Sequence, residues 1–115
     1  MKKPTPENSV KAEVRKWLRM KGWFVFHILQ GIGAFKGVSD FIAAKDGIVL
    51  FIECKSKKGT LSDDQKYFGR NIVEHRCHYI VARGYEDVQE YLERLAAPSA
   101  HDIADDGRLS YRCED

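Results

Sequence analysis

The first part of the chain carries its apolar side chains at helical spacing. Thr5 followed by Pro6 suits a helix N-cap and first turn, and Gly22 suits a helix end, so we expect a helix over residues 5–21. At about 100° per residue, Glu7 points along the centre of the apolar stripe. Its carboxylate either belongs to a buried site or lies in solvent in the first turn, where it favours the helix dipole. Helical geometry leaves both readings open. The stripe consists of Val10, Val14, Trp17 and Leu18.

Four runs of β-branched, aromatic and aliphatic residues predict strands, at 23–29, 40–44, 48–54 and 79–82. The segment 45–47, Lys-Asp-Gly, separates the second and third runs, which is a hairpin signal. The third run is almost continuously apolar, as in a central strand covered on both faces. Residues 30–37 contain three glycines and no periodicity, so we expect a mobile loop there.

Helical spacing returns twice in the second half of the chain. Ser62 and Gln65 form a capping-box pattern before a helix that runs to about Glu74, and residues 86–95 form a closing helix. The predicted order is one helix, three strands, a helix, a strand and a helix. This order predicts an α/β fold.

With 115 residues, of which 43% are hydrophobic and 31% charged, the chain has the size and balance of one globular domain. No apolar run approaches the roughly 20 residues of a transmembrane helix, and residues 1–7 are polar and contain proline. We therefore expect no membrane association, no signal peptide and a cytosolic (cytoplasmic) location. The three cysteines, at 54, 77 and 113, form no CxxC pair and argue against a disulfide framework or a zinc ribbon.

The formal net charge of +2 conceals two unlike parts. Residues 96–115 contain more acidic than basic side chains, so the positive excess belongs to the rest of the chain. A modestly basic body is compatible with phosphate binding, although many cytosolic proteins share this property. We divide the chain into a domain at 5–95 and an acidic tail at 96–115, which has little apolar periodicity and is expected to be flexible.

Two charged residues end the most apolar strand. Glu53 and Lys55 emerge on one face because side chains alternate along a strand, while Cys54 points away. Taken alone, they fit a strand-end pair that reaches solvent. If the 45–47 turn pairs the flanking strands, Asp40 at the start of one strand lies near Glu53 and Lys55 at the end of the other. Two carboxylates and an ammonium then converge, a combination that suits Mg²⁺ and phosphate chemistry.

These motifs resemble the PD-(D/E)xK nuclease superfamily. The segments that carry the likeness are 37–40 (Gly-Val-Ser-Asp), 53–55 (Glu-Cys-Lys) and 61–65 (Leu-Ser-Asp-Asp-Gln), within a likeness that spans roughly residues 7–92. They are most similar to the VRR-NUC (virus-type replication-repair nuclease) domain, in particular its stand-alone phage and bacterial members. The resemblance implies a restriction-endonuclease-like fold, with a mixed central sheet flanked by helices and a closing C-terminal helix. It also implies a metal-dependent DNA endonuclease. Ser39 departs from the pattern, which has proline before the aspartate.

Carried over residue by residue, the resemblance implies a metal and catalytic site. Asp40 and Glu53 match ligands of a Mg²⁺ or Mn²⁺ ion, with the backbone carbonyl of Cys54 as a further ligand. Lys55 matches the catalytic lysine. Glu7 matches a first-helix glutamate that completes or supports the acidic site. In the following helix, Gln65 matches a glutamine that orients the lysine, a water or the metal shell.

The resemblance also implies partners. Branched or duplex DNA would be cut to leave a 5′-phosphate and a 3′-hydroxyl, and a homodimer would resolve four-way (Holliday) junctions, because symmetric resolution needs two cuts. A restriction-type or nicking nuclease and a non-catalytic nucleic-acid-binding module of the same fold remain alternatives. Lys36, Lys57 and Lys58 flank the expected site as candidate phosphate contacts, although a solvated loop would have the same sequence.

The other chemistry-bearing residues fit structural roles better. His27, on the first expected strand, is more often a packed or surface histidine than a catalytic one. Cys54 points into an apolar strand face and Cys77 lacks an activating basic pattern, which favours core packing over thiol chemistry. Four aromatic residues of the first helix and strand are expected to lie in the core rather than to stack on bases, namely Trp17, Trp23, Phe24 and Phe26.

Overall fold

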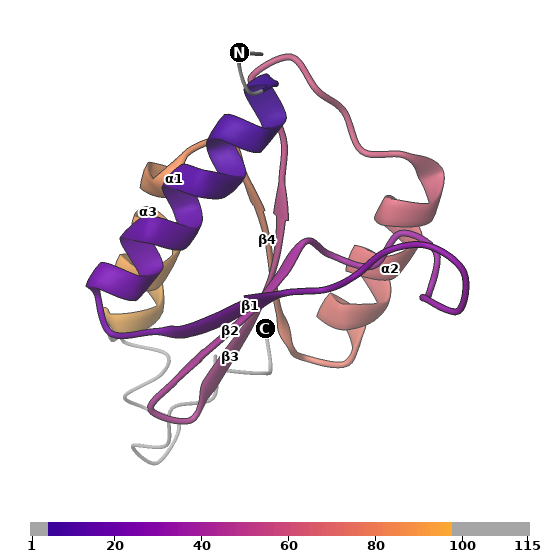
Figure 1. Cartoon of the computed structure of the whole chain (residues 1–115). Coiled ribbons are helices and arrows are strands. Elements are labelled where there is room, and N and C mark those ends of the chain that lie inside the picture. The colour runs from indigo at the N-terminus through magenta and orange to yellow at the C-terminus, as the bar shows by residue number, and fades with distance from the viewer. Residues whose placement is uncertain (1–4, 98–115) are drawn as a thin grey trace.

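The computed structural model describes residues 5–97 and contains the predicted elements in the predicted order (Figure 1). All of the predicted helices and strands are confirmed, with shifts of a few residues at their ends. Most of the acidic tail proposed at 96–115 lies outside the described residues. The elements are α1 (Pro6–Met20), β1 (Phe24–His27), β2 (Phe41–Lys45), β3 (Ile48–Cys54), α2 (Asp63–Glu74), β4 (His78–Ala82) and α3 (Tyr85–Ala96).

Local sequence signals explain the main element boundaries. The side chain of Thr5 accepts a hydrogen bond from the Asn8 amide at 3.1 Å and caps α1, an interaction typically worth about 1 kcal/mol. Between β2 and β3, Asp46 and Gly47 have φ values of 50° and 83°, as a two-residue hairpin turn requires. Along residues 5–97, no helix is long and apolar enough to cross a membrane.

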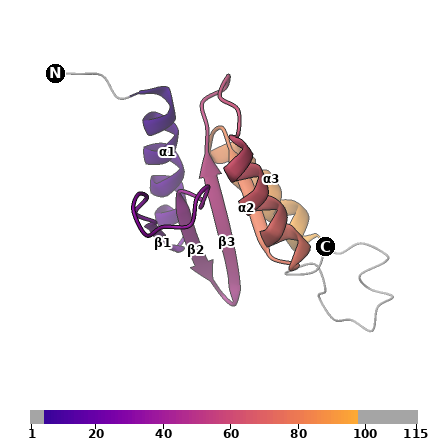
Figure 2. The ribbon, with the colours of Figure 1, turned by 90° about the vertical axis from the view of Figure 1, so that its right-hand side faces the viewer.

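The sheet has the strand order β1-β2-β3-β4. The first three strands are antiparallel, and β4 pairs parallel to β3 after the α2 crossover, so the sheet is mixed. Helices α1 and α3 cover one face, whereas α2 lies on the other face over the β4 side (Figure 1). Figure 2 shows that α2 leaves β1 and β2 uncovered on this second face. The predicted α/β architecture is therefore confirmed.

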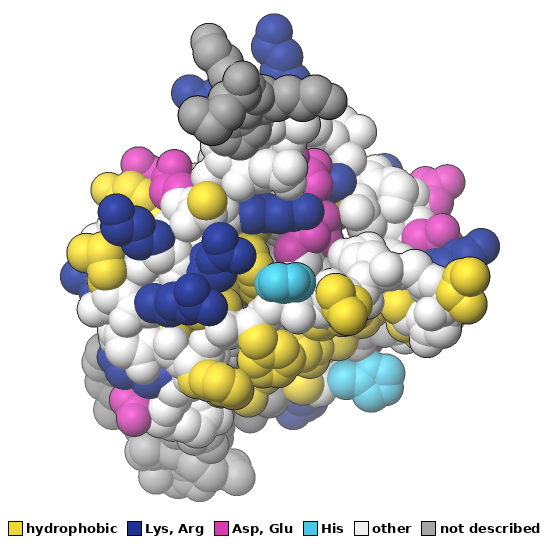
Figure 3. Space-filling model, in the orientation of Figure 1, with side chains coloured by type: hydrophobic (Ala, Val, Ile, Leu, Met, Phe, Trp, Pro, Cys, Tyr) yellow, Lys and Arg dark blue, Asp and Glu magenta, His cyan; other side chains and the backbone are white. Residues whose placement is uncertain are grey.

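One prediction about β1 is wrong. Phe24 and Phe26 were expected in the core, but their exposed fractions are 68% and 42%. Val25, between them, is buried against α1 and α3, so alternation directs both phenylalanines to the uncovered face. Val49 on β3 is also exposed there, and hydrophobic side chains lie at the surface along β1 and the loop after it (Figure 3). We call Phe24, Phe26 and Val49 the open sheet face.

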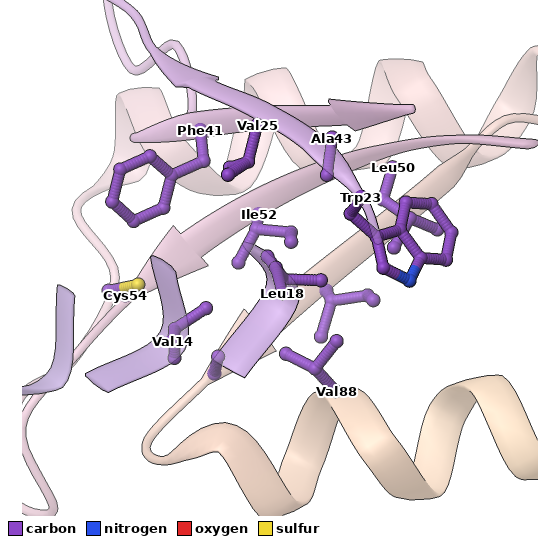
Figure 4. Close-up of a cluster of buried hydrophobic side chains, with 12 residues drawn as sticks. Val14, Leu18, Trp23, Val25, Phe41, Ala43, Leu50, Ile52, Cys54 and Val88 are labelled. Carbon is purple, nitrogen blue, oxygen red and sulfur yellow. The ribbon is translucent and has the colours of Figure 1, made fainter. Parts of the chain in front are cut away.

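The core lies between the sheet and the α1 and α3 helices (Figure 4). Val14 and Leu18 of α1 are fully buried against alternate residues of the strands. Burying side chains of this size stabilises a fold by roughly 1.5–3 kcal/mol each. Trp23 is buried as predicted, and Trp17 packs at the core edge, where it stacks on Tyr85 at 5.8 Å between ring centroids.

The long loop between β1 and β2 is fixed at both of its ends. The Ile28 amide donates to the carbonyl oxygen of Asp40 at 2.9 Å, and the side-chain amide of Gln30 donates to the carbonyl oxygen of Val38 at 3.1 Å. Between these anchors, residues 31–34 form a tip in which Ile32 is fully exposed. The loop therefore has a fixed base and a tip that packs against little else.

Candidate functional site

Three carboxylates meet at one end of the sheet. Glu7 comes from the first turn of α1, Asp40 directly precedes β2, and Glu53 lies near the end of β3. One oxygen of each lies within 4.8 Å of the others. The β2–β3 register explains part of this meeting, because Phe41 pairs with Ile52 and one further step brings Asp40 opposite Glu53. The convergence expected from the hairpin is therefore observed.

Asp40 is held by the backbone of the neighbouring strand. Its Oδ2 accepts a hydrogen bond from the Cys54 amide at 2.7 Å, and only 7% of the residue is exposed. A hydrogen bond from a backbone amide to a carboxylate is short and strong. It fixes the orientation of the side chain, so the second oxygen, Oδ1, is directed to the other charged groups, where it lies 3.4 Å from the Lys11 ammonium.

Glu53 is the most buried charged group of the site, with 1% exposure. Its Oε2 accepts a hydrogen bond from Gln65 at 3.1 Å and lies 3.7 Å from the Lys55 ammonium. Its Oε1 is buried and has no hydrogen-bond partner within residues 5–97. Burial, followed by the nearby Asp40 charge, raises the pKa of Glu53 from 4.5 to about 8, although Lys55 acts in the opposite direction.

Gln65 links the start of α2 to Glu53. Its side-chain oxygen accepts from the Ser62 amide at 2.9 Å while the Ser62 hydroxyl accepts from the Gln65 amide at 3.1 Å, which completes the predicted capping box. The oxygen is occupied in this way, and the side-chain nitrogen is left to donate to Glu53. The helix cap therefore fixes the position of the Gln65 side chain and presents its nitrogen, rather than its oxygen, to the Glu53 carboxylate.

Glu7 contacts two ammonium groups. One oxygen lies 3.8 Å from Lys55 and the other 3.7 Å from Lys11, one helical turn further along α1. Burial lowers the pKa of Lys11, but the charges of Asp40 and Glu7 outweigh this effect and leave the pKa above its usual value. The alignment of Glu7 with the apolar stripe is thus explained by a site at the end of that stripe.

The donor set fits a divalent cation. Carboxylate oxygens are the ligands that Mg²⁺ and Mn²⁺ prefer, and three of them converge here. The buried Oε1 of Glu53 lacks a partner among the described residues, and a cation would supply one. Asp40, Glu53 and Glu7 are therefore the side chains that can hold the ion.

The carboxylates line an open cleft of about 490 Å³. Its other walls contain basic residues that the sequence reading did not single out, Lys11 and Arg15 of α1. His27, expected to be packed or at the surface, is exposed and also lines the cleft. The signal for the two α1 residues was present in the sequence, because Lys11 and Arg15 follow Glu7 at steps of four residues.

The remaining candidates lie away from the cleft walls. Lys36, Lys57 and Lys58 are exposed, and none of them lines the cleft. Cys54 is fully buried in the core, and burial raises the pKa of its thiol, so the predicted packing role is confirmed. Cys113 lies outside the described residues.

A comparison with solved structures supports the fold. No protein-family model matches the chain, and no curated protein matches it. A solved structure described as a "VRR_NUC domain" matches with a TM-score of 0.68 and 18% sequence identity, over 78% of this chain and 97% of that one. At this level of identity the likeness concerns the arrangement of the elements. The chain therefore has the fold of a VRR_NUC domain.

Proposed function

We propose that the chain is a divalent-metal-dependent DNA endonuclease that hydrolyses phosphodiester bonds. The observation that carries the proposal is the junction of three carboxylates with Lys55 at a cleft, where a buried oxygen of Glu53 lacks a partner within the described part of the chain. The similarity to a VRR_NUC domain structure supports the same activity, because that domain is named for a nuclease. Catalysis by this class of enzyme depends mainly on position and charge.

Asp40, Glu53, Glu7 and the backbone carbonyl of Cys54 would hold the Mg²⁺ or Mn²⁺ ion. When bound, the ion polarises the scissile phosphate and makes a neighbouring water more acidic. The fixed orientation of Asp40 and the burial of Glu53 prepare these ligands before an ion arrives.

Lys55 supplies the positive charge of the proposed reaction. Its ammonium lies 3.7 Å from Glu53 and 3.8 Å from Glu7, so two carboxylates hold it at the end of β3. There it orients the attacking water and offsets the negative charge that develops on the phosphate. Gln65 keeps Glu53 in place through its hydrogen bond and acts as a positioning residue.

The direct test is cleavage of a panel of single-stranded, duplex, flap and four-way DNA in Mg²⁺, in Mn²⁺ and in EDTA. We expect metal-dependent products with 5′-phosphate and 3′-hydroxyl ends, and a loss of about 10²–10⁴-fold in Lys55→Ala. Lys16→Ala, which removes an exposed lysine of α1, is the matched control. If Lys55→Ala cleaves as fast as the control, the assignment is wrong. Binding without turnover across the whole panel would favour a non-catalytic module.

We further propose that the enzyme acts in the cytosol on four-way junctions as a homodimer. Symmetric resolution needs two active sites, and the chain contains one such cluster within residues 5–97. The open sheet face supports this proposal, because it offers Phe24, Phe26 and Val49 to a second copy.

Sedimentation with and without junction DNA tests the dimer. Phe24→Glu together with Phe26→Glu should shift the protein to monomer and convert paired cuts into single nicks. Wild-type protein that stays monomeric at micromolar concentration, with DNA and without it, would contradict the dimer and favour a nicking or restriction-type enzyme. Lys36, Lys57 and Lys58 remain proposed phosphate contacts.

A further inference from the structure

A basic stripe runs along α1 in line with the candidate active site. Lys11, Arg15 and Arg19 follow Glu7 at successive steps of four residues, so all four lie on one side of the helix. The stripe starts at the acidic cluster, where the Lys11 ammonium lies 3.4 Å from Asp40, and it continues away from it. Figure 3 shows Lys and Arg side chains gathered over α1 beside acidic side chains and a histidine.

The two arginines of this stripe are available for a ligand. Arg15 is half-buried and lines the cleft together with His27, and Arg19 is exposed. Neither makes an ion pair or a side-chain hydrogen bond with another residue of the 5–97 region. By contrast, Arg83 donates to the carbonyl oxygens of Ser56 and Gly59, at 2.6 and 2.7 Å, and holds a loop. Arg15 and Arg19 therefore hold no loop in place in the way that Arg83 does.

The length of the stripe suits a run of phosphates. Arg19 lies eight positions after Lys11, which corresponds to about 12 Å along a helix at 1.5 Å per residue. A DNA strand carries one phosphate per nucleotide, so a stripe of this length can reach more than one phosphate of the strand. Guanidinium groups suit phosphate oxygens because their donors can bind two of them at once.

We propose that Lys11, Arg15 and Arg19, with His27 beside them, bind the phosphate backbone of the DNA strand that leads away from the scissile phosphate. This inference rests on the proposed nuclease function and names the surface that holds its substrate. The binding is independent of base sequence, since the contacts are made to phosphates. It assigns the main contacts to α1, on a different element from the loop that carries Lys57 and Lys58.

The test is DNA binding by metal-free protein in EDTA, measured over a range of salt concentrations on duplexes of two unrelated sequences. Arg15→Gln with Arg19→Gln should weaken binding to both duplexes. It should also reduce the slope of log affinity against log salt by about two, or roughly 0.9 for each lost phosphate contact. Arg15→Lys with Arg19→Lys keeps both charges and should retain most of the slope.

A matched control removes the same charge elsewhere. Arg70→Gln with Arg94→Gln neutralises one exposed cation on α2 and one on α3, where Arg94 forms an exposed pair with Glu90 at 4.0 Å. If the stripe variant and this control have the same slope and affinity, the inference is wrong while the proposed nuclease can still stand. If wild-type protein neither binds nor cleaves DNA, the proposed function itself fails. Thermal melting of each variant excludes loss of the fold as the cause.

Discussion

The sheet and the helix contribute to the acidic cluster in different ways. Asp40 and Glu53, beside and on the strands, are 7% and 1% exposed, and each accepts a hydrogen bond of defined geometry. On α1, the side chains of Glu7 and Lys11 are 38% and 33% exposed and contact their partners through ion pairs of 3.4–3.8 Å. The strand carboxylates are fixed by folding, whereas the helix groups keep freedom to move.

The strand carboxylates and the α1 groups also differ in how they affect the stability of the fold. Burial of a carboxylate such as Glu53 disfavours its charged form, which is why its pKa is raised. Partly exposed ion pairs such as Glu7 with Lys11 contribute little, typically below about 1 kcal/mol. The buried carboxylates Asp40 and Glu53 therefore destabilise the metal-free fold, but they need no rearrangement to bind an ion. Glu7 and Lys11 of α1 can change position to fit an ion and a phosphate at a small cost in free energy.

The largest expected contrast is between Asp40→Asn and Glu7→Gln. Asp40→Asn should lower DNA cleavage by about 10²–10³-fold, because it removes charge from a fixed ligand. Glu7→Gln should lower the cleavage rate by only about 10-fold, since Glu7 is a mobile group whose loss its neighbours can compensate in part. Cleavage rates at saturating Mn²⁺, with melting curves as a check on folding, measure both. Equal losses would show that the helix carboxylate is as essential as the strand one.

Gln65→Ala tests whether the positioning of Glu53 matters. We expect a 10- to 100-fold loss in metal affinity or cleavage, because the hydrogen bond to Glu53 disappears. Ser62→Ala is the matched variant, since it also breaks the capping box but makes no contact with Glu53. Both should lower stability by about 1 kcal/mol. A similar loss of activity in Ser62→Ala would assign the effect to the helix cap instead.

Gly37→Ala should destabilise the fold where the segment before Asp40 packs against α2. Gly37 has φ of 82°, and a Cβ there would overlap the carbonyl oxygen of Asp64 at the start of α2. We expect a loss of about 2 kcal/mol, which corresponds to a Tm lower by roughly 10 °C. Gly33→Ala has a similar φ of 92° but nothing within 4 Å, so it should cost only the backbone strain of about 1 kcal/mol. Equal melting temperatures of the two variants would show that the contact with Asp64 does not cause the loss of stability.

The last expected contrast concerns the stability of metal-free protein, which should depend on pH. The folded state raises the pKa of Glu53 from 4.5 to about 8, so it binds a proton more tightly than the unfolded chain does. Stability of the wild type should therefore fall as pH rises from about 4.5 to 8. Glu53→Gln stays neutral, so its Tm relative to wild type should rise between pH 5 and pH 8. A constant difference would show that Glu53 is ionised throughout, and added Mn²⁺ should stabilise only the wild type.

Local signals were sufficient to predict most of the fold from the sequence. The Asp46-Gly47 turn fixes the β2–β3 register, and that register alone brings Asp40 toward Glu53. Phe24 and Phe26 were misplaced because a strand pattern indicates two faces without indicating which of them a helix covers. That depends on where α2 packs, and α2 lies over the β4 side.

The site was predictable in its carboxylates and less so in its cations. Glu7, Asp40, Glu53, Lys55 and Gln65 all lie together, as the motifs implied. The polarity of the Gln65 amide could not be predicted, since it depends on the Ser62 amide occupying the oxygen. The basic stripe of α1 was visible in the sequence but becomes meaningful only when Lys11 and Arg15 are found in the cleft wall with Asp40.

The loop between β1 and β2 offers a place where length can change without cost to the carboxylates. Its base is closed by the bond from Ile28 to Asp40 and by that from Gln30 to Val38, whereas residues 31–34 lie beyond both bonds. Closing a longer flexible segment costs only about 0.6 kcal/mol for each doubling of its length. Related chains can therefore differ in this tip, and a designer can graft a recognition segment into it, while Asp40 stays in register.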